Sequence, residues 1–221
     1  MAEYTLVRSR RRRTFCLQVD GQGALRVLAP ASARLEAIEE FVSGQTDWIE
    51  RIRRRLAGRP KPVVLTDGAL VPYLDTTLRV VLGADGGRPR AERDGDVLRI
   101  AAADGAAMRG HIELWYRAEA YRHGIERILH FAPLVGRAPK KLRIAGQRTR
   151  WGSCSSRGTI SLNWRLMLAP AALFDYVVAH ELCHLLAPHH GEGFWREMAR
   201  VMPDYAVHRR ALRAQGDRFT L

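Results

Sequence analysis

Two histidines four residues apart in an apolar stretch most restrict how this chain can fold. The segment from Pro170 to about Leu186 is apolar, and it contains His180-Glu181-Leu182-Cys183-His184. On an α-helix, residues four apart differ by about 40° around the axis, so both imidazoles project from one face and can reach one ion. Burying these histidines without partners would be costly, and a metal ion removes that cost. The segment therefore predicts a metal-binding helix.

Glu181 completes an H-E-x-x-H pattern. It lies about 100° around the helix from His180, too far to share the ion comfortably but well placed to hold a water bound to it. This arrangement is typical of a catalytic zinc site, in which the ion also binds a water. Cys183 points away from the two histidines and is expected to be a small buried side chain. The sequence thus predicts Zn²⁺, bound by His180 and His184, beside a catalytic Glu181.

A catalytic zinc site needs a third protein ligand, because three ligands and a water fill its coordination sphere. Pro188 should end the helix and let the chain return toward the ion. His189 and His190 follow it directly, and either can supply the ligand. His190 is favoured, since it lies six positions after His184, the spacing of the third histidine in H-E-x-x-H-x-x-G-x-x-H. Ala187 stands where that pattern has glycine, which argues against the same turn.

The rest of the chain alternates strand and helix patterns, which predicts an α+β fold. Pro133 is expected to end the long helix that precedes the metal-binding half. The pattern changes near residue 106, which suggests a β-rich region with a two-helix segment over residues 1–105 and a core over 106–221, although the two can form one compact unit. Strands are expected at 14–19, 25–29, 70–73, 78–82, 97–100, 142–145 and 159–164, and helices near 32–42, 46–56, 106–130, 170–186, 192–202 and 205–214.

The charge and the cysteine content of the chain indicate its cellular compartment, but they do not identify its function. The chain has 36 Lys and Arg against 23 Asp and Glu, a net charge of +13, and only three of the basic residues are lysines. Arg10–Arg13 is either a phosphate-binding arm or the charged protection of an edge strand. The longest uncharged apolar stretch, Leu166–Phe174, is too short to span a membrane. Three widely spaced cysteines and no apolar N-terminal segment predict a cytoplasmic protein without disulfides.

The second half contains the motifs Arg148–Ser156, Ile160–Leu166, His180–His184, His190-Gly191, Phe194-Trp195 and Met202–Tyr205. Together they resemble the YgjP-like metallopeptidases, a family related to the SprT-like zinc proteases. The resemblance is close over about residues 140–205 and looser over the first half. It implies a zincin-like catalytic core, an active-site helix packed on a small sheet, zinc bound by His180, His184 and His190, and Glu181 as general base.

The expected reaction is hydrolysis of a peptide or protein by a zinc-activated water. From zincin architecture, the strand 159–164 is expected to present an exposed edge to the substrate. Tyr205 and Arg150 are the candidates for stabilising the oxyanion. Trp151–Ser153 is interpreted as a scaffold turn, and Phe194 and Trp195 as packing residues. The alternatives are a non-catalytic basic zinc module that binds nucleic acid, and a protease that acts on DNA-associated proteins.

Overall fold

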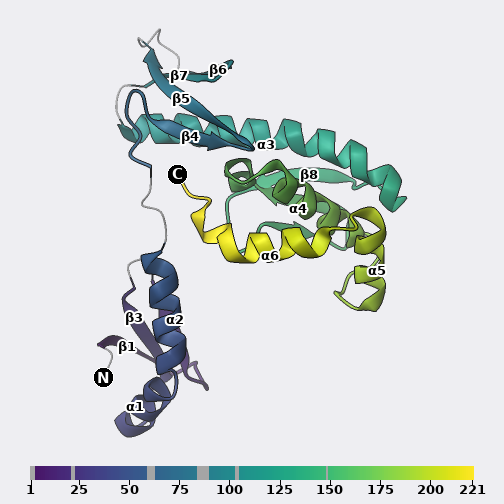
Figure 1. Ribbon diagram of the computed structural model, residues 1–221. Coiled ribbons are helices and arrows are strands. Elements are labelled where there is room, and N and C mark those ends of the chain that lie inside the picture. The colour runs from purple at the N-terminus through teal and green to yellow at the C-terminus, as the bar shows by residue number, and fades with distance from the viewer. Residues whose placement is uncertain (1–2, 21–22, 59–62, 84–89, 103–104, 148) are drawn as a thin grey trace. The chain divides into compact units, whose positions relative to one another are not determined.

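The computed structural model describes residues 3–20, 23–58, 63–83, 90–102, 105–147 and 149–221. The chain forms two compact units, Met1–Lys61 and Pro62–Leu221 (Figure 1). Both contain helices and strands, so the predicted α+β class is confirmed. The structure divides the chain between Lys61 and Pro62. The predicted boundary between residues 105 and 106 lies inside the second unit. There, Val80 and Ile100 before the predicted boundary share one apolar core with Ile112 and Tyr116 after it.

The first unit is a three-stranded sheet with two helices. Strands β2 (Cys16–Val19) and β3 (Leu25–Pro30) form the predicted antiparallel hairpin. A strand that the sequence analysis missed, β1 (Tyr4–Ser9), pairs in parallel with β3, so the order is β1-β3-β2. Arg10–Arg13 lies between β1 and β2, outside any strand. Helices α1 (Leu35–Ser43) and α2 (Thr46–Ala57) contribute Ile38, Val42 and Ile49 to the core of this unit.

The second unit begins with a four-stranded sheet of order β4-β5-β7-β6, followed by the long helix α3. Figure 1 shows α3 between this sheet and the remaining elements of the unit. The predicted strands 70–73, 78–82 and 97–100 are present, whereas β6 was not predicted. The bounds are β4 (Leu70–Tyr73), β5 (Thr76–Gly83), β6 (Arg90–Asp94), β7 (Val97–Ala101) and α3 (Gly105–Val135).

Helix α3 passes through Pro133 instead of ending before it, so the predicted end was wrong. Proline costs a helix one hydrogen bond, and in the last turn few further bonds depend on it. The helix ends instead at Val135, and the next residue, Gly136, has a φ of 78° and donates its N–H to the Ala132 carbonyl at 2.9 Å. A left-handed glycine is a common helix terminator because it lacks a Cβ atom.

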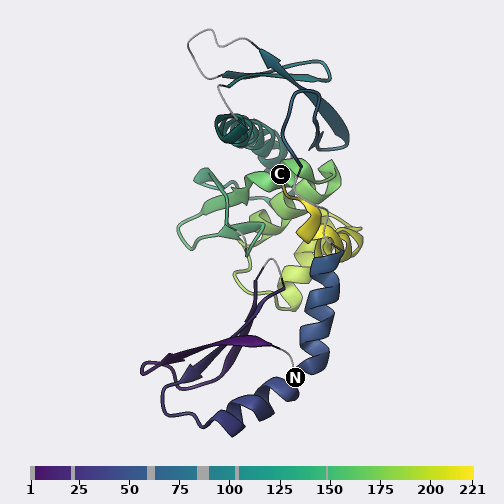
Figure 2. The ribbon, with the colours of Figure 1, turned by 90° about the vertical axis from the view of Figure 1, so that its left-hand side faces the viewer.

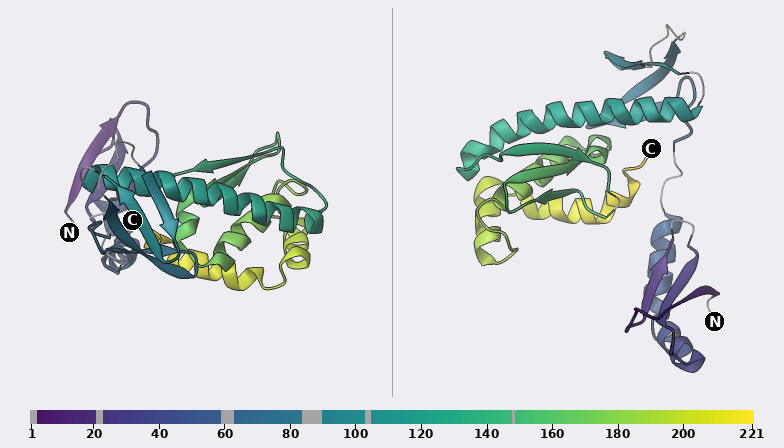
Figure 3. Two further views of the ribbon diagram at one scale, coloured as in Figure 1. Left: turned by 90° about the horizontal axis from the view of Figure 1, so that it is seen from above. Right: turned by 180° about the vertical axis from the view of Figure 1, so that it is seen from behind.

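A second, three-stranded sheet of order β8-β10-β9 lies beneath α3 and beside the apolar helix α4. Figure 2, which views the molecule along α3, and both panels of Figure 3 show the same arrangement from other sides. Strand β10 pairs in parallel with β8 and antiparallel with β9. The bounds are β8 (Lys141–Ala145), β9 (Gly152–Cys154), β10 (Thr159–Asn163), the 3-10 helix η1 (Trp164–Leu168), α4 (Ala171–Cys183), α5 (Glu192–Val201), α6 (Tyr205–Gln215) and η2 (Gly216–Arg218).

Helix α4 is the most buried helix of the unit, and specific polar contacts hold it. Asp75 accepts a hydrogen bond from the backbone N–H of Ala171 at 3.2 Å, which satisfies one free donor at the helix start. Arg127 of α3 binds Asp175 through two hydrogen bonds of 2.6 and 2.9 Å. These contacts fix the position of α4 along α3, and therefore the position of the motif at its C-terminal end.

The apolar helix ends at Cys183, earlier than Pro188 alone would predict. After Cys183 the chain forms hydrogen bonds to carbonyls three residues back, from Leu185 N–H to Leu182 and from Leu186 N–H to Cys183. Such bonds tighten a last turn and stop the α-helical pattern. Within the described part of the chain, none of the helices combines the length and the apolar character that a membrane crossing requires.

Candidate metal centre

Three histidine side chains meet at the C-terminal end of α4. His180 belongs to the last turn of the helix, His184 follows it directly, and His190 comes from the segment between α4 and α5. Their nearest ring nitrogens all lie within 4.8 Å of one another, and the Nε2 atoms of His180 and His190 are 3.0 Å apart. Among the described residues, these three histidines form the one group of at least three potential ligand side chains that could hold an ion.

The chemical state of the histidines suits a cation. Nδ1 of His184 lies 3.1 Å from the Ala187 carbonyl, which can only accept a hydrogen bond, so Nδ1 is the donor and Nε2 is the nitrogen left to bind a metal ion. Burial lowers the pKa of His180 to about 3, with the neighbouring His184 and His190 adding to the effect. Burial and His184 also lower the pKa of His190. These two imidazoles are therefore neutral at neutral pH, as metal ligands must be.

Aromatic side chains of α5 hold the cluster together. The ring of Phe194 is almost fully buried, and its centroid lies 4.5–4.8 Å from those of all three histidines. Trp195 stacks on His190 at 5.6 Å and donates a hydrogen bond from Nε1 to the His190 carbonyl at 3.0 Å. The predicted packing role of Phe194 and Trp195 is thus confirmed, since both fix the returning segment against α4.

Glu181 is buried beside the cluster, with only 5% of its surface exposed. Its Oε2 atom has no hydrogen-bond partner among the described residues. Burial raises the pKa of Glu181 to about 8, and the positive charge of Arg150 opposes that rise. A carboxyl group with a pKa near the working pH can both accept and release a proton, which is what general acid–base catalysis requires.

The other residues that the sequence analysis singled out lie outside the histidine cluster. His189 is exposed and outside the cluster, so the structure brings His190 and not His189 to the other two histidines. Arg150 is exposed on the segment before β9, close enough to Glu181 to affect its pKa. Tyr205 is half-buried and stacks on Trp195 at 5.4 Å. Cys183 is fully buried, as predicted.

The edge strand near the site is β9, which corrects the expectation for residues 159–164. Strand β10 is paired on both sides, with β8 and with β9, so it has no exposed edge. The residues interpreted as a scaffold turn include Gly152 and Ser153, which belong to β9. Strand β9 contacts α4, and a Cβ atom on Gly152 would lie 2.4 Å from Oε1 of Glu181. The edge of this sheet therefore passes directly beside the predicted general base.

Tyr176 is a residue of the site that the sequence analysis missed. It lies one helical turn before His180, and its ring centroid is 5.7 Å from that of His180. Its position four residues before the first histidine of the motif was the available signal, because side chains at this spacing share a helix face. The apolar composition of α4 made a core role the simpler interpretation.

Comparisons with known proteins agree with this geometry. A buried H-E-x-x-H helix with a third histidine defines the site of a metal-dependent hydrolase. The family model for the YgjP-like metallopeptidase domain matches residues 13–215, and the chain therefore belongs to the YgjP-like family. It is a metallopeptidase, and peptides or proteins are its substrates. The family membership predicted from the motifs is thus confirmed.

The chain was also compared with curated proteins and with solved structures. A search of curated proteins gave no match. Among solved structures, the metallopeptidase zymogen abylysin of Pyrococcus abyssi aligns with a TM-score of 0.40 and 23% identity. The alignment covers 44% of this chain and 99% of the abylysin chain.

Proposed function

We propose that this metallopeptidase binds zinc through His180, His184 and His190 and uses Glu181 as its general base. The observation that carries the proposal is the three-histidine cluster with an unpaired, buried carboxyl beside it. Ligands of a tetrahedral zinc ion at about 2.0–2.1 Å are roughly 3.3 Å apart. The 3.0 Å separation of the His180 and His190 Nε2 atoms is near that value. Neutral imidazoles are also the ligands that zinc favours.

Each side chain then has a defined task. Zinc, when bound, acts as a Lewis acid that acidifies water and polarises a peptide carbonyl. Glu181 accepts the proton of the attacking water and passes it to the leaving amine. The Gly152 backbone and the surrounding apolar residues hold the Glu181 carboxyl in place and exclude bulk water from it. Tyr205 and Arg150 are the proposed hydrogen-bond donors to the developing oxyanion.

Strand β9 is the proposed platform for an extended peptide. The hydrogen bonds from Asn163 N–H to the Trp151 carbonyl and from Ser155 N–H to the Thr159 carbonyl fix which backbone groups face β10. Because these groups alternate along an antiparallel pair, the N–H and C=O groups of Gly152 and Cys154 face away from β10. A substrate strand added at this edge would bind through its main chain with little sequence preference.

A structural zinc module that binds nucleic acid fits the site less well. Structural zinc sites are usually closed by four protein ligands, whereas the described residues supply three. A buried carboxyl without a partner is costly in a purely structural site. The net charge of +13 is the remaining support for nucleic acid binding. Binding driven by phosphates must weaken strongly between about 50 and 200 mM salt, and salt-independent binding would argue against it.

The proposal is tested by zinc content and peptide cleavage of the wild type and two matched variants. Glu181→Gln should retain zinc and lose cleavage, because it removes the base and leaves the ligands. Glu192→Gln makes the same chemical change at an exposed position of α5 and should keep both properties. Equal cleavage by the wild type and Glu181→Gln would overturn the role of Glu181. A purified protein that binds no zinc would overturn the metal assignment.

A further inference from the structure

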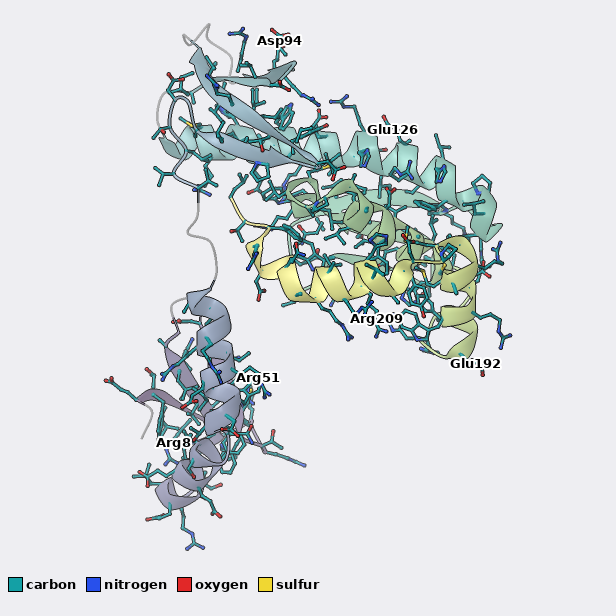
Figure 4. The ribbon with its side chains drawn as sticks, viewed as in Figure 1. Arg8, Arg51, Asp94, Glu126, Glu192 and Arg209 are labelled. Atoms are coloured by element: carbon teal, nitrogen blue, oxygen red, sulfur yellow. The ribbon has the colours of Figure 1, made fainter. Side chains whose placement is uncertain are left out.

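An arginine of α6 lies one aromatic ring away from the proposed zinc ligand His190. The Arg209 guanidinium carbon is 4.3 Å from the centroid of the Trp195 ring, which itself stacks on His190. Figure 4 labels Arg209 on α6 and Glu192 at the start of the neighbouring helix α5. Arg209 is half-buried, so its position is better defined than that of a freely exposed arginine. The stack therefore holds a positive charge at the edge of the site.

In the described part of the chain, no acidic side chain pairs with Arg209. Within the residues that the structure describes, Arg213, one turn further along α6, forms no ion pair with an acidic side chain either. Neighbouring acidic groups are already engaged, Glu192 with Arg196 at 2.7 Å and Asp204 with His208 at 2.9 Å. Glu197 is paired with Arg200. Two arginines on one face of α6 thus remain available to an external anion.

Helix α6, which carries both arginines, packs against α4, which carries Tyr176 and His180. The ring centroids of Tyr176 and His180 are 5.7 Å apart. The two arginines therefore belong to a helix that borders the site, and a bound divalent cation would add to the positive potential there.

The chemistry of a stacked guanidinium indicates which anion fits. The Arg209 guanidinium lies over the face of the Trp195 ring, and among the described residues its N–H groups donate no hydrogen bond. Those donors match the two oxygens of a carboxylate in a bidentate hydrogen-bonded pair. Peptides carry carboxylates on Asp and Glu side chains and at the C-terminus. Both sources present the same group to the arginine.

We propose that Arg209, assisted by Arg213, binds a carboxylate of the peptide substrate close to the scissile bond and so makes the enzyme selective for acidic substrates. This inference rests on the proposed function, because it concerns the substrate of the same zinc site. Arg209 is a specificity-determining residue in this scheme and takes no part in bond cleavage.

Cleavage of three peptide sets by the zinc-loaded full chain tests the proposal. The peptides of the first set are amidated and neutral except for a single Glu, which is placed at a different position in each peptide. The second carries Gln at the same positions, and the third has neutral side chains and a free C-terminal carboxylate. Wild type should cleave the best Glu peptide with a kcat/KM about tenfold above its Gln counterpart, the advantage expected of a charge-assisted pair. A preference in the third set instead would assign Arg209 to the C-terminal carboxylate.

Variants separate charge recognition from packing. Arg209→Gln should remove the acidic preference, measured as the ratio of kcat/KM for the Glu and Gln peptides, whereas Arg209→Lys should retain part of that ratio through its charge. Arg209→Glu should favour peptides with Lys at the same position. Arg210→Gln, one residue away and exposed, is the matched control and should keep the acidic preference.

The failures of the two proposals are distinguishable. Cleavage of none of the peptides by zinc-loaded wild type would count against the proposed function. Equal cleavage of the Glu, Gln and free-carboxylate peptides would overturn the carboxylate inference and leave the proposed function intact. An acidic preference that survives in Arg209→Glu would also overturn the role of Arg209.

Discussion

The carboxyl group of Glu181 occupies the space in which any residue other than glycine at position 152 would place its Cβ atom. A Cβ on Gly152 would lie 2.4 Å from Oε1, 2.7 Å from Cγ and 2.9 Å from Cδ of Glu181. Real Cβ atoms essentially never approach other heavy atoms this closely. Helix α4 and strand β9 can therefore pack at this distance only because residue 152 lacks a side chain.

We expect Gly152→Ala to lower kcat by about a hundredfold, because a displacement of about 1 Å in a catalytic group can have that effect. The new methyl group must push either the Glu181 carboxyl or the edge of β9 away from its place. Zinc content should stay unchanged, since the substitution does not touch the histidines. Steady-state kinetics and metal analysis on the same preparation check both expectations.

Gly193→Ala is the control for this substitution. A Cβ on Gly193 meets no heavy atom within 4 Å, although the residue lies in α5 beside the centre. Alanine also has a better helix propensity than glycine, so this variant should be as stable as the wild type or slightly more stable. If Gly152→Ala were as active as Gly193→Ala, the close approach would not constrain Glu181.

The burial of Glu181 predicts a pH dependence of stability in the metal-free protein. Its pKa is raised from 4.5 to about 8 in the folded state. Between these values the folded protein keeps a proton that the unfolded chain has lost, so the free energy of unfolding falls as the pH rises. His180 acts in the opposite direction, but only between about pH 3 and 6.5. The effect of Glu181 is therefore clearest between pH 6.5 and 8.

Glu181→Gln should abolish this contribution. In the presence of a chelator, the variant should gain stability relative to the wild type by up to about 1.4 kcal/mol per pH unit from pH 6.5 to 8. Denaturant unfolding at several pH values measures the difference, and contributions common to both proteins cancel. Parallel stability curves would mean that the Glu181 carboxyl is hydrated in the metal-free protein.

The sequence was informative wherever a local pattern determines geometry. The spacing of His180 and His184 places both on one helix face in any α-helix, and the motif set around residues 140–205 was specific enough to identify the family. The predicted helices and most strands also agree with the structure, because their apolar periodicity is regular. Local periodicity thus predicted which segments form helices and strands, but it predicted their ends and the pairing of the strands less well.

Local sequence patterns could not predict the features that depend on contacts between segments far apart in the chain. Strand β9 has three residues and begins with glycine, so it carries no alternating pattern, and the edge of the sheet was assigned to residues 159–164 instead. The end of α3 was misplaced because a proline in a last turn disturbs few hydrogen bonds. The stack of Arg209 on Trp195 joins two helices, and no spacing within either helix predicts it.

Phe194 provides a test of how packing supports metal binding. Its buried ring contacts all three histidines, so Phe194→Ala removes their common support and leaves a cavity. We expect a loss of about 3–5 kcal/mol in the free energy of unfolding of the metal-free protein. Zinc affinity should fall as well, since the imidazoles gain rotational freedom.

Phe194→Leu is the informative comparison, because it keeps most of the buried volume. It should lose less stability and retain tighter zinc binding than Phe194→Ala. Calorimetric titration with zinc, together with denaturant unfolding in a chelator, separates the two effects. Unchanged zinc affinity in Phe194→Ala would show that the backbone alone orients the histidines.

The ion pair between Arg127 and Asp175 should make a measurable contribution to the anchoring of α4. Both side chains are about three-quarters buried at the junction of α3 and α4, and the pair is bidentate. A double-mutant cycle with Arg127→Met and Asp175→Asn should give a coupling energy of about 1 kcal/mol, above the usual value for surface pairs. Each single variant should also lower kcat modestly, because α4 carries His180 and Glu181.

The exposed pair Arg196 and Glu192 in α5 is the matched comparison for this cycle. Its two side chains are 75% and 89% exposed, so water and salt screen their attraction and the coupling should be too small to measure. Raising the salt concentration should leave the Arg127–Asp175 coupling largely intact, since burial limits screening. Equal coupling in the two pairs would mean that apolar packing alone positions α4, and that the ion pair contributes no more than a surface contact.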